Sequence, residues 1–386
     1  MRHKLLAMNF FYLVWLFAVV FSLMYLFVMM GFLSGWNGLV NYTQKQKQHH
    51  TRVSILLPFY NEIENLEACV EGLVYQQIQT TLVEILLIDD HATDGSTSLA
   101  KQLAARYYQV SYLANPQGTK GKKAALKTGI ANAKGDLFIT TDADCNHPPH
   151  WLATMIDYYE TQQAELIIGP VNMQIGTSWL QKFQGIEFVS LIGTTGGAAG
   201  INRPIMCNGA NLAFTKAVYQ EFSDPFKKEF ISGDDVFLMH QVKSRYPESI
   251  HFIKSEQALV QTKSAANWRQ FFDQRFRWAS KTPGYTDSDT LFTARVVFGI
   301  SLTVILSALL MIQDLDFYKP LLFVFLFKTA IDSWFFFWVA PFFNKRKLAV
   351  YIPLFELFYS FYVVIASVSI FFKSKYRSGS KLPDTV

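Results

Sequence analysis

The sequence predicts an α/β domain with a mostly parallel sheet, joined to about four helices that cross a membrane. Three observations support this fold class. Short apolar runs alternate with helical patterns between residues 53 and 140, and four longer apolar runs lie outside that region. Charged residues make up 17% of the 386 residues, below the roughly 25% that is usual in soluble proteins. With 51% hydrophobic residues, the chain is not a disordered, collagen-like or disulfide-scaffold protein.

The four long apolar runs predict the membrane segments. Residues 9–33 carry no charge and, at about 1.5 Å per residue, are long enough to cross a hydrocarbon core of ~30 Å. They are too long for a removed signal peptide and lack its small-residue cleavage site. The expected organisation is an N-terminal anchor (1–40), a sheet domain (51–264), an amphipathic helix at the membrane surface (265–285), three spans (291–372) and a polar tail (373–386).

Basic residues near the runs predict the orientation. Lys45, Lys47 and Arg52 follow the first run, and Lys345, Arg346 and Lys347 lie between the third and fourth. By the positive-inside rule both clusters are cytoplasmic. We therefore expect a multi-pass protein of the inner or plasma membrane with its sheet domain in the cytoplasm.

The basic tail conflicts with four crossings, which would place it outside. The tail contains Lys373, Lys375, Arg377 and Lys381. Either it departs from the rule, or the last run, which contains Pro353 and Glu356, does not fully cross. Both alternatives stay open.

A pair of opposite charges lies inside the third run. Lys328 and Asp332 are four residues apart and share one helical face. Such a pair can line a path for a polar acceptor. The favoured interpretation is a self-neutralising pair packed inside the bundle.

The sheet domain is predicted element by element. Apolar runs of four to six residues that end at turn or acidic residues are typical of buried parallel strands, and the segments between them have helical spacing. The predicted order is strand 53–57, helix 61–77, strand 83–88, a helix from Ser96, strand 110–113, helix 121–133 and strand 137–140.

Acidic residues follow two of these strands. Ligands bind beyond the carboxyl ends of strands in such sheets. Asp142 and Asp144 can together hold a hard divalent cation that binds a diphosphate, although Asp-x-Asp triplets also cap turns. Asp89 or Asp90 can accept a hydrogen bond from a base or ribose; the alternative is an Asx turn that includes Asp94.

Three further features suggest a transfer reaction. Lys122 begins a helix, a position that suits phosphate. Asp235, after Gly233 and Asp234, can be a general base or part of a helix N-terminus, and these alternatives are about even. In the last motif, Gln274, Arg277 and Trp278 share a helical face. Arg277 can hold a diphosphate, Trp278 can stack on a sugar, and the other, apolar side of this helix is expected to lie on lipid.

Taken together, these motifs resemble family 2 glycosyltransferases with the GT-A fold, a Rossmann-like fold, in the membrane-integrated branch that includes cellulose, chitin and hyaluronan synthases. Ceramide glucosyltransferase-like enzymes are an equally close comparison, because only three C-terminal runs are present. The resemblance extends from Val53 to Trp278, and its motifs occur in the family's order: residues 58–62, 89–96, 121–126, 142–144, 207–211, 233–235 and 274–278.

The resemblance implies inverting transfer of a sugar from a nucleotide-sugar, with a UDP-sugar expected, to a lipid, lipid-linked or polysaccharide acceptor. Asp235, with Asp234 and Arg277, would be catalytic, and Asp142 and Asp144 would bind Mg²⁺ or Mn²⁺. The implied partners are membrane lipid and glycan, without nucleic acid, and the oligomeric state is not indicated. Implied donor-binding residues are Pro58, Tyr60, Glu62, Asp89, Asp90, Lys122, Asp142, Gln274 and Arg277; the acceptor side would comprise Asn208, Gly209 and Trp278.

Two alternatives remain. Polyprenyl-phosphate glycosyltransferases share the fold but usually lack the Gln-x-x-Arg-Trp motif. A non-catalytic membrane scaffold or transporter would not need Asp142, Asp144, Asp235 and Arg277, which are all present.

Overall fold

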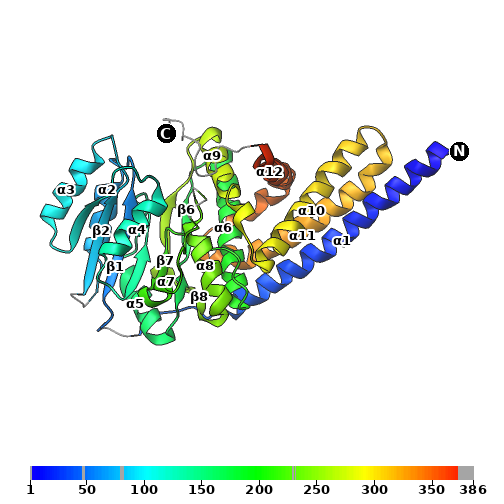
Figure 1. Cartoon of the computed structure of the whole chain (residues 1–386). Helices are drawn as coiled ribbons and strands as arrows, with labels where there is room; N and C mark the ends of the chain where they lie inside the picture. The colour runs from blue at the N-terminus through cyan, green and yellow to red at the C-terminus, as the bar shows by residue number, and fades with distance from the viewer. Residues whose placement is uncertain (1, 46–47, 79–81, 228–229, 231, 373–386) are drawn as a thin grey trace.

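The computed structural model describes residues 2–45, 48–78, 82–227, 230 and 232–372. Lys47 and the predicted tail lie outside the described residues. The chain has a sheet domain at one end and long helices at the other, with the N-terminus at the far tip of the helices (Figure 1). One continuous set of buried apolar residues runs from the sheet into these helices.

The main sheet has seven strands in the order β3-β2-β1-β4-β7-β5-β8. Strands β1, β2, β3 and β4 are parallel, and β7 runs antiparallel between β4 and β5. The carboxyl ends of β1, β2 and β4 therefore lie at one edge, as the sequence predicts. The strands are Val53–Phe59 (β1), Val83–Asp89 (β2), Val110–Ala114 (β3), Leu137–Thr140 (β4), Leu166–Ile168 (β5), Leu212–Thr215 (β7) and Ile250–Phe252 (β8).

Helices connect the strands and cover the sheet. The chain passes from β1 through β2 to β3 and then returns to β4 on the other side of β1. Right-handed connections put α2 and α3 on one face and α4 on the opposite face. The helices that connect the strands of the main sheet include Leu66–Val74 (α2), Ser96–Arg106 (α3), Lys122–Asn132 (α4), Trp151–Gln162 (α5), Lys216–Gln220 (α7) and Asp234–Arg245 (α8).

The helix α6 (Trp179–Gly200) joins the sheet domain to the long helices. It packs on β8 and on α1 (Arg2–Gly38), and the small parallel sheet of β6 (Val171–Gln174) and β9 (Val260–Lys263) lies beside it. The contact with α1 is between backbones, since a Cβ at Gly197 would lie 2.1 Å from the carbonyl oxygen of Phe32. Only residues without side chains permit this approach.

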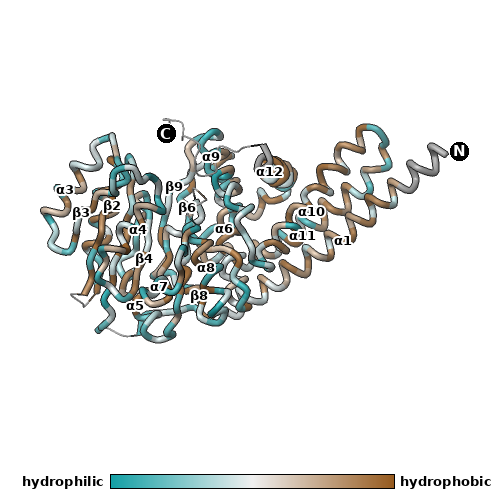
Figure 2. The backbone as a smooth tube through the Cα atoms, viewed as in Figure 1, coloured by the Kyte–Doolittle hydropathy of each residue, from teal (hydrophilic) through white to brown (hydrophobic). Residues whose placement is uncertain are grey.

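In the part of the chain that the structure describes, four helices are long and apolar enough to cross a membrane: α1, α10 (Ser288–Met311), α11 (Tyr318–Val339) and α12 (Ile352–Phe372). Figure 2 shows them as the most hydrophobic part of the chain. Lys328 of α11 lies buried between Asp332 and Glu356, at 2.6 and 2.5 Å. The pair predicted from the sequence is therefore present, packed inside the bundle, and has a third member.

The strands begin where the sequence predicts, whereas the first helix is shorter. The prediction for 61–77 exceeds α2 at both ends, because Asn61 has a left-handed φ of 54° and belongs to a turn. Pro58 lies within β1 because β1 pairs with β4 only as far as Leu56. Beyond Leu56, no described strand lies on the β4 side of β1 to accept a hydrogen bond. The missing N–H of Pro58 therefore costs no hydrogen bond there.

Candidate active site

The cation-binding candidates lie at the carboxyl end of β4. Asp142 forms an ion pair with Lys122, the first residue of α4. Asp144 accepts a hydrogen bond from the Thr262 hydroxyl at 3.1 Å. Burial, and then the charge of Asp142, raises the pKa of Asp144. The pKa of Glu62, after β1, is also raised, by burial and by the charges of these two aspartates, so the three carboxylates lie close enough to affect one another's charge.

This arrangement fits a divalent cation that is shared with a ligand. Three converging carboxylates with one lysine leave an excess of negative charge and hard oxygen donors, which suit Mg²⁺ or Mn²⁺. Among the described residues, no three acidic, histidine or cysteine side chains are arranged to hold a metal by themselves. Asp142 and Asp144 would therefore hold the ion together with oxygens of a bound diphosphate.

The two acids after β2 have different environments. Asp89 is buried, and its carboxylate accepts hydrogen bonds from the Ala92 N–H, the Thr97 hydroxyl and the Tyr112 hydroxyl, at 2.8, 2.6 and 3.0 Å. Asp90 is half-buried and accepts from the backbone N–H of Gly121 at 2.7 Å. Asp89 thus shapes the turn, and Asp90 is the acid nearer the rim.

At the end of β1, Pro58 is buried and Tyr60 is 49% exposed. Tyr60 is therefore the member of this motif whose side chain can contact a ligand directly. Glu62 reaches the same rim from the following turn, where its carboxylate accepts from the Asn65 amide at 2.7 Å.

The segment 207–211 lies between β4 and the start of α8 and contacts both. The carbonyl of Gly209 accepts from the Thr140 hydroxyl at 2.7 Å, and its N–H donates to Asp235 at 3.1 Å. A Cβ at Gly209 would lie 3.2 Å from the Lys122 amine. Gly209 therefore lies against Lys122 and Asp235. The side-chain oxygen of its neighbour Asn208 accepts a hydrogen bond from the Ala210 N–H.

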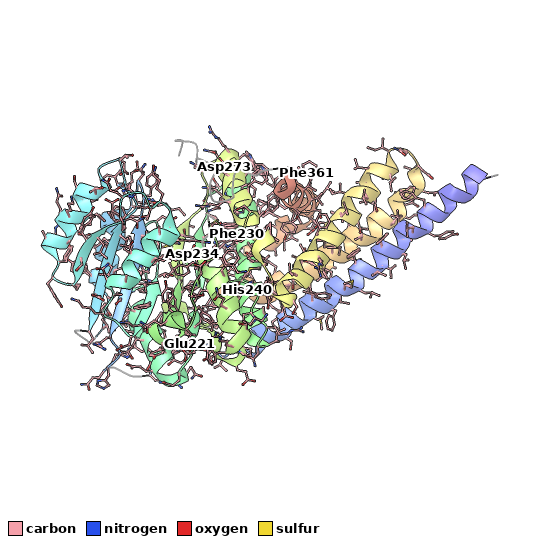
Figure 3. The ribbon with its side chains drawn as sticks, viewed as in Figure 1. Glu221, Phe230, Asp234, His240, Asp273 and Phe361 are labelled. Atoms are coloured by element: carbon pink, nitrogen blue, oxygen red, sulfur yellow. The ribbon has the colours of Figure 1, made fainter. Side chains whose placement is uncertain are left out.

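The pKa values of Asp235 and Asp234 are shifted in opposite directions. Burial tends to raise the pKa of Asp235, but Lys281 and Lys122 outweigh it and lower that pKa. The Lys281 amine lies 3.5 Å from Asp235, which also accepts from its neighbour's N–H at 2.8 Å. Burial raises the pKa of Asp234, which Figure 3 shows between the sheet and α9. Asp235 is thus the ionised acceptor of the pair.

The helix α9 (Trp268–Ala279) carries the Gln274–Trp278 motif. Arg275 is buried, forms an ion pair with Glu187 of α6, and lies between the rings of Phe271 and Trp278, 4.4 Å from each centroid. Gln274 accepts a hydrogen bond from Arg275.

Arg277 is exposed, and its carbonyl accepts from the Ser232 hydroxyl at 3.2 Å, next to Gly233. This contact places the end of α9 beside the start of α8. One face of the Trp278 ring is covered by Arg275, and the ring packs against the core of the domain.

The structure corrects the expected environment of the apolar side of α9. Phe271 is fully buried and packs on Phe183 of α6, with ring centroids 5.7 Å apart, and on Tyr362 of α12 at 5.6 Å. Phe271 therefore packs on α6 and α12 where lipid was expected, whereas Trp268 on the same side is 44% exposed.

The structure brings four of the predicted residues, Asp142, Lys122, Gly209 and Asp235, close together. Direct contacts link Asp142 to Lys122 and Gly209 to Asp235, and the Ser232 contact adds the end of α9. Two residues were not singled out from the sequence: Lys281 and Glu187. For Lys281 the available signal was its position three residues after the Gln-x-x-Arg-Trp motif.

Comparison with known proteins shows what parts of this chain resemble. Residues 54–220 match the model of glycosyl transferase family 2. Over 186 residues, 48% of this chain, the sequence is 25% identical to "Glycosyltransferase AglE" of Haloferax volcanii. Over 133 residues, 34% of this chain, it is 34% identical to an undecaprenyl-phosphate 4-deoxy-4-formamido-L-arabinose transferase of Aeromonas hydrophila. The matches span 59% and 40% of these relatives' own lengths.

A solved structure resembles almost the whole chain. A mannosyltransferase from Pyrobaculum calidifontis, PcManGT, solved with GDP-Man and Mn²⁺, aligns with 94% of this chain and 99% of its own, with a TM-score of 0.56 and 15% identity. This likeness supports the GT-A fold. Residues 54–220 therefore match the glycosyl transferase family 2 model and have the GT-A fold, and among the described residues four helices are apolar and long enough to cross a membrane.

Proposed function

We propose that the protein is an inverting glycosyltransferase. It transfers a sugar from a nucleotide-diphosphate donor to a hydroxyl of a lipid or lipid-linked acceptor at the cytoplasmic face of a membrane. The family model, the relatives named as glycosyltransferases and the apolar helices support this proposal. The observation that carries it is the ionised Asp235, held by backbone N–H groups at the same edge as Asp142.

The donor lies along the rim of the sheet in this proposal. Tyr60 and Asp90 contact the nucleoside, and Lys122 and Arg277 contact the diphosphate, which Arg binds well through its planar fork. A divalent cation, when bound by Asp142 and Asp144, supplies electrostatic stabilisation of the departing diphosphate. Lys122 then exchanges its ion pair with Asp142 for the phosphate oxygens.

The transfer is a single displacement. The carboxylate of Asp235 accepts the proton of the acceptor hydroxyl, and that oxygen forms the new bond to the anomeric carbon. The bond from this carbon to the phosphate oxygen breaks, and its electron pair leaves with the nucleoside diphosphate. Attack opposite to the leaving group inverts the anomeric configuration.

A polyprenyl phosphate is the second candidate acceptor. The Aeromonas relative is named for undecaprenyl phosphate, and Lys281 and Arg277 would suit a phosphate. A phosphate oxygen is already ionised near neutral pH and needs no general base. The two acceptors therefore predict different dependence on Asp235.

The test is Asp235→Asn in the full chain. Loss of a general base typically costs a factor of 10²–10⁴, so we expect transfer to fall by that order while binding of a nucleotide-sugar is kept. Binding and transfer are measured on purified protein with UDP- and GDP-sugars and a membrane lipid extract. The control is Asp136→Asn, whose exposed ion pair with Arg52 lies before β4, at the opposite end of that strand.

Retained transfer in Asp235→Asn would reject the general base. If the labelled product were then a glycosyl phosphate lipid, the polyprenyl-phosphate candidate would replace the hydroxyl acceptor. An equal loss in Asp136→Asn would show that the loss is not specific to the site.

A further inference from the structure

The helix α12 runs in a different direction from the other three candidate spans. In Figure 1, α1, α10 and α11 extend side by side across the view, whereas α12 is seen nearly end-on. It nevertheless packs on the bundle through Glu356, which pairs with Lys328 of α11, and Tyr359, whose ring centroid lies 4.8 Å from the Lys328 amine. If the bundle crosses a bilayer along its length, α12 lies closer to the bilayer plane.

Within α12, the exposed side chains that the structure describes, as far as Val368, form an apolar stripe. Its residues are spaced three or four apart, so they lie above one another on one side of the helix. The opposite side carries the buried Glu356 and Ser360. A stripe of this kind exposed to water would promote aggregation, but it suits contact with lipid. Its members, 37–60% exposed, are Leu354, Leu357, Phe361, Ile365 and Val368.

The polar helix α9 fixes the depth at which α12 can lie. Trp268 packs on Phe358, with ring centroids 5.3 Å apart, and Phe271 packs on Tyr362. Tyr362 lies ten residues into α12, which is about 15 Å along the axis and half of a hydrocarbon core of ~30 Å. Were α12 to cross the bilayer, α9 would enter it with its exposed charged side chains, which is costly. Those side chains belong to Arg269, Asp273 and Arg277.

The start of α12 has the composition of a membrane interface. Trp179 of α6 packs on Tyr351 and Phe355, with ring centroids 5.7 Å away in each case. The Lys182 amine lies 4.5 Å from the Tyr351 centroid and bonds the Tyr351 hydroxyl at 3.1 Å. Tryptophan, tyrosine and lysine gather at the level of lipid head groups.

We propose that α12 is a membrane-surface helix. It lies in the interfacial layer of the bilayer, with the stripe from Leu354 to Val368 against acyl chains and its aromatic side against α9. Such helices bury an apolar face about 5–10 Å into the head-group boundary. The lipid surface is therefore the partner of α12, and α9 rests on the opposite side with its Gln274–Trp278 motif above the head groups.

This placement has a topological consequence. A helix that lies in the interface does not change the side of the membrane, so α12 would begin and end on the side of the sheet. That is the alternative left open by the basic residues at 373–381, and it agrees with the positive-inside rule.

The test measures depth along α12 in the full chain, reconstituted in vesicles of phosphatidylcholine and phosphatidylglycerol. Single cysteines replace Leu354, Phe361 and Val368, carry a spin label, and are read by the relative accessibility to oxygen and to a water-soluble nickel complex. The three positions span 14 residues, about 21 Å along the helix. We expect the same depth for all three within a few ångströms.

Exposed positions on α10 provide the matched control. Phe292→Cys and Leu309→Cys lie on a helix of the bundle, are 40% and 56% exposed, and should differ in depth by about 25 Å. Every labelled position is exposed, so the label points away from the protein. If a variant fails to fold, Leu357→Cys or Ile365→Cys takes its place. The native chain, treated with the same label, sets the background, because Cys207 is only partly buried whereas Cys69 and Cys145 are buried.

A steady change in depth from Leu354 to Val368, equal to that along α10, would overturn the proposal. Equal depth in bulk water rather than at the interface would also overturn it. Because the measurement needs no substrate, its outcome is independent of the proposed glycosyl transfer.

Discussion

At the scale of single residues, two lysines control the charges of the site. Lys122 pairs with Asp142, and Lys281 lies 3.5 Å from Asp235. Burial tends to lower the pKa of Lys281, but Asp235 outweighs it and raises that pKa. A protonated lysine therefore stands beside the proposed general base at neutral pH and keeps it ionised.

Lys281→Met tests this coupling through the pH dependence of transfer. The pKa of Asp235 is lowered in the folded protein, so the ionised base persists to low pH and is lost as the pH falls through that value. Without Lys281 the pKa rises, and the acid limb of the pH–rate profile should move to higher pH. Lys281→Arg keeps the charge and should leave the limb in place. An unmoved acid limb in Lys281→Met would show that the lysine has no electrostatic role.

The sequence predicts the residues that lie in motifs, and it does not predict partners that are distant in the chain. Asp142, Asp144, Asp235 and Lys122 follow strands or begin helices, and those positions are readable from local patterns. Glu187 is separated from Arg275 by 88 residues. Nothing in its surroundings marks it, because its role arises only when α6 packs on α9.

At the scale of elements, α9 is held from two sides. Arg275 and Glu187, both almost fully buried, link α9 to α6, while Phe271 and Trp268 pack on α12. A buried ion pair is costly to desolvate, and removing one partner leaves an uncompensated charge. The pair therefore fixes the register of α9 more than it adds stability.

A double-mutant cycle tests this element. Glu187→Met leaves Arg275 buried and unpaired, and removal of one partner typically costs about 3–5 kcal/mol. The unfolding temperature of the full chain should therefore fall. Adding Arg275→Met should recover most of the loss, because two apolar side chains then pack together, while transfer stays impaired if α9 loses its position. A double variant as unstable as the sum of both single variants would argue against a coupled pair.

Helices and strands were predictable where the apolar residues follow a single pattern along the segment. Buried parallel strands such as β1 and β2 read as short apolar runs bounded by turn residues. The helix α6 was not predicted, because it is buried on most sides and rich in glycine near its end, and it lacks a polar face. The apolar side of α9 was correctly recognised, but its partner lies far along the chain, since Trp268 contacts Phe358 and Phe271 contacts Tyr362.

At the scale of the whole molecule, the contact of α1 with α6 couples the membrane helices to the sheet. Gly35 and Gly197 meet there, since a Cβ at Gly35 would lie 1.9 Å from the carbonyl oxygen of Gly197. The buried apolar cluster continues from the sheet domain into these helices. The site is therefore held at a fixed height relative to the bundle.

Gly197→Ala should separate these helices. The added Cβ meets backbone, which cannot move aside as a side chain can, and overpacking commonly costs about 1–3 kcal/mol. Gly38→Ala is the matched control at the end of α1, where a Cβ has nothing within 4 Å. Thermal unfolding of the purified chain should show a lower midpoint for Gly197→Ala and an unchanged one for Gly38→Ala. Equal midpoints would mean that the α1–α6 contact adds little to stability.

The most direct measurement of the proposed activity is nucleoside diphosphate release by the full chain in membranes, with labelled nucleotide-sugars and Mg²⁺ or Mn²⁺. We expect one donor to release diphosphate in equal amount to the labelled sugar recovered in the lipid extract. A chelator and Asp235→Asn should each stop both. Donor binding without diphosphate release, for every donor and every acceptor extract, would contradict the transferase and favour a non-catalytic membrane protein.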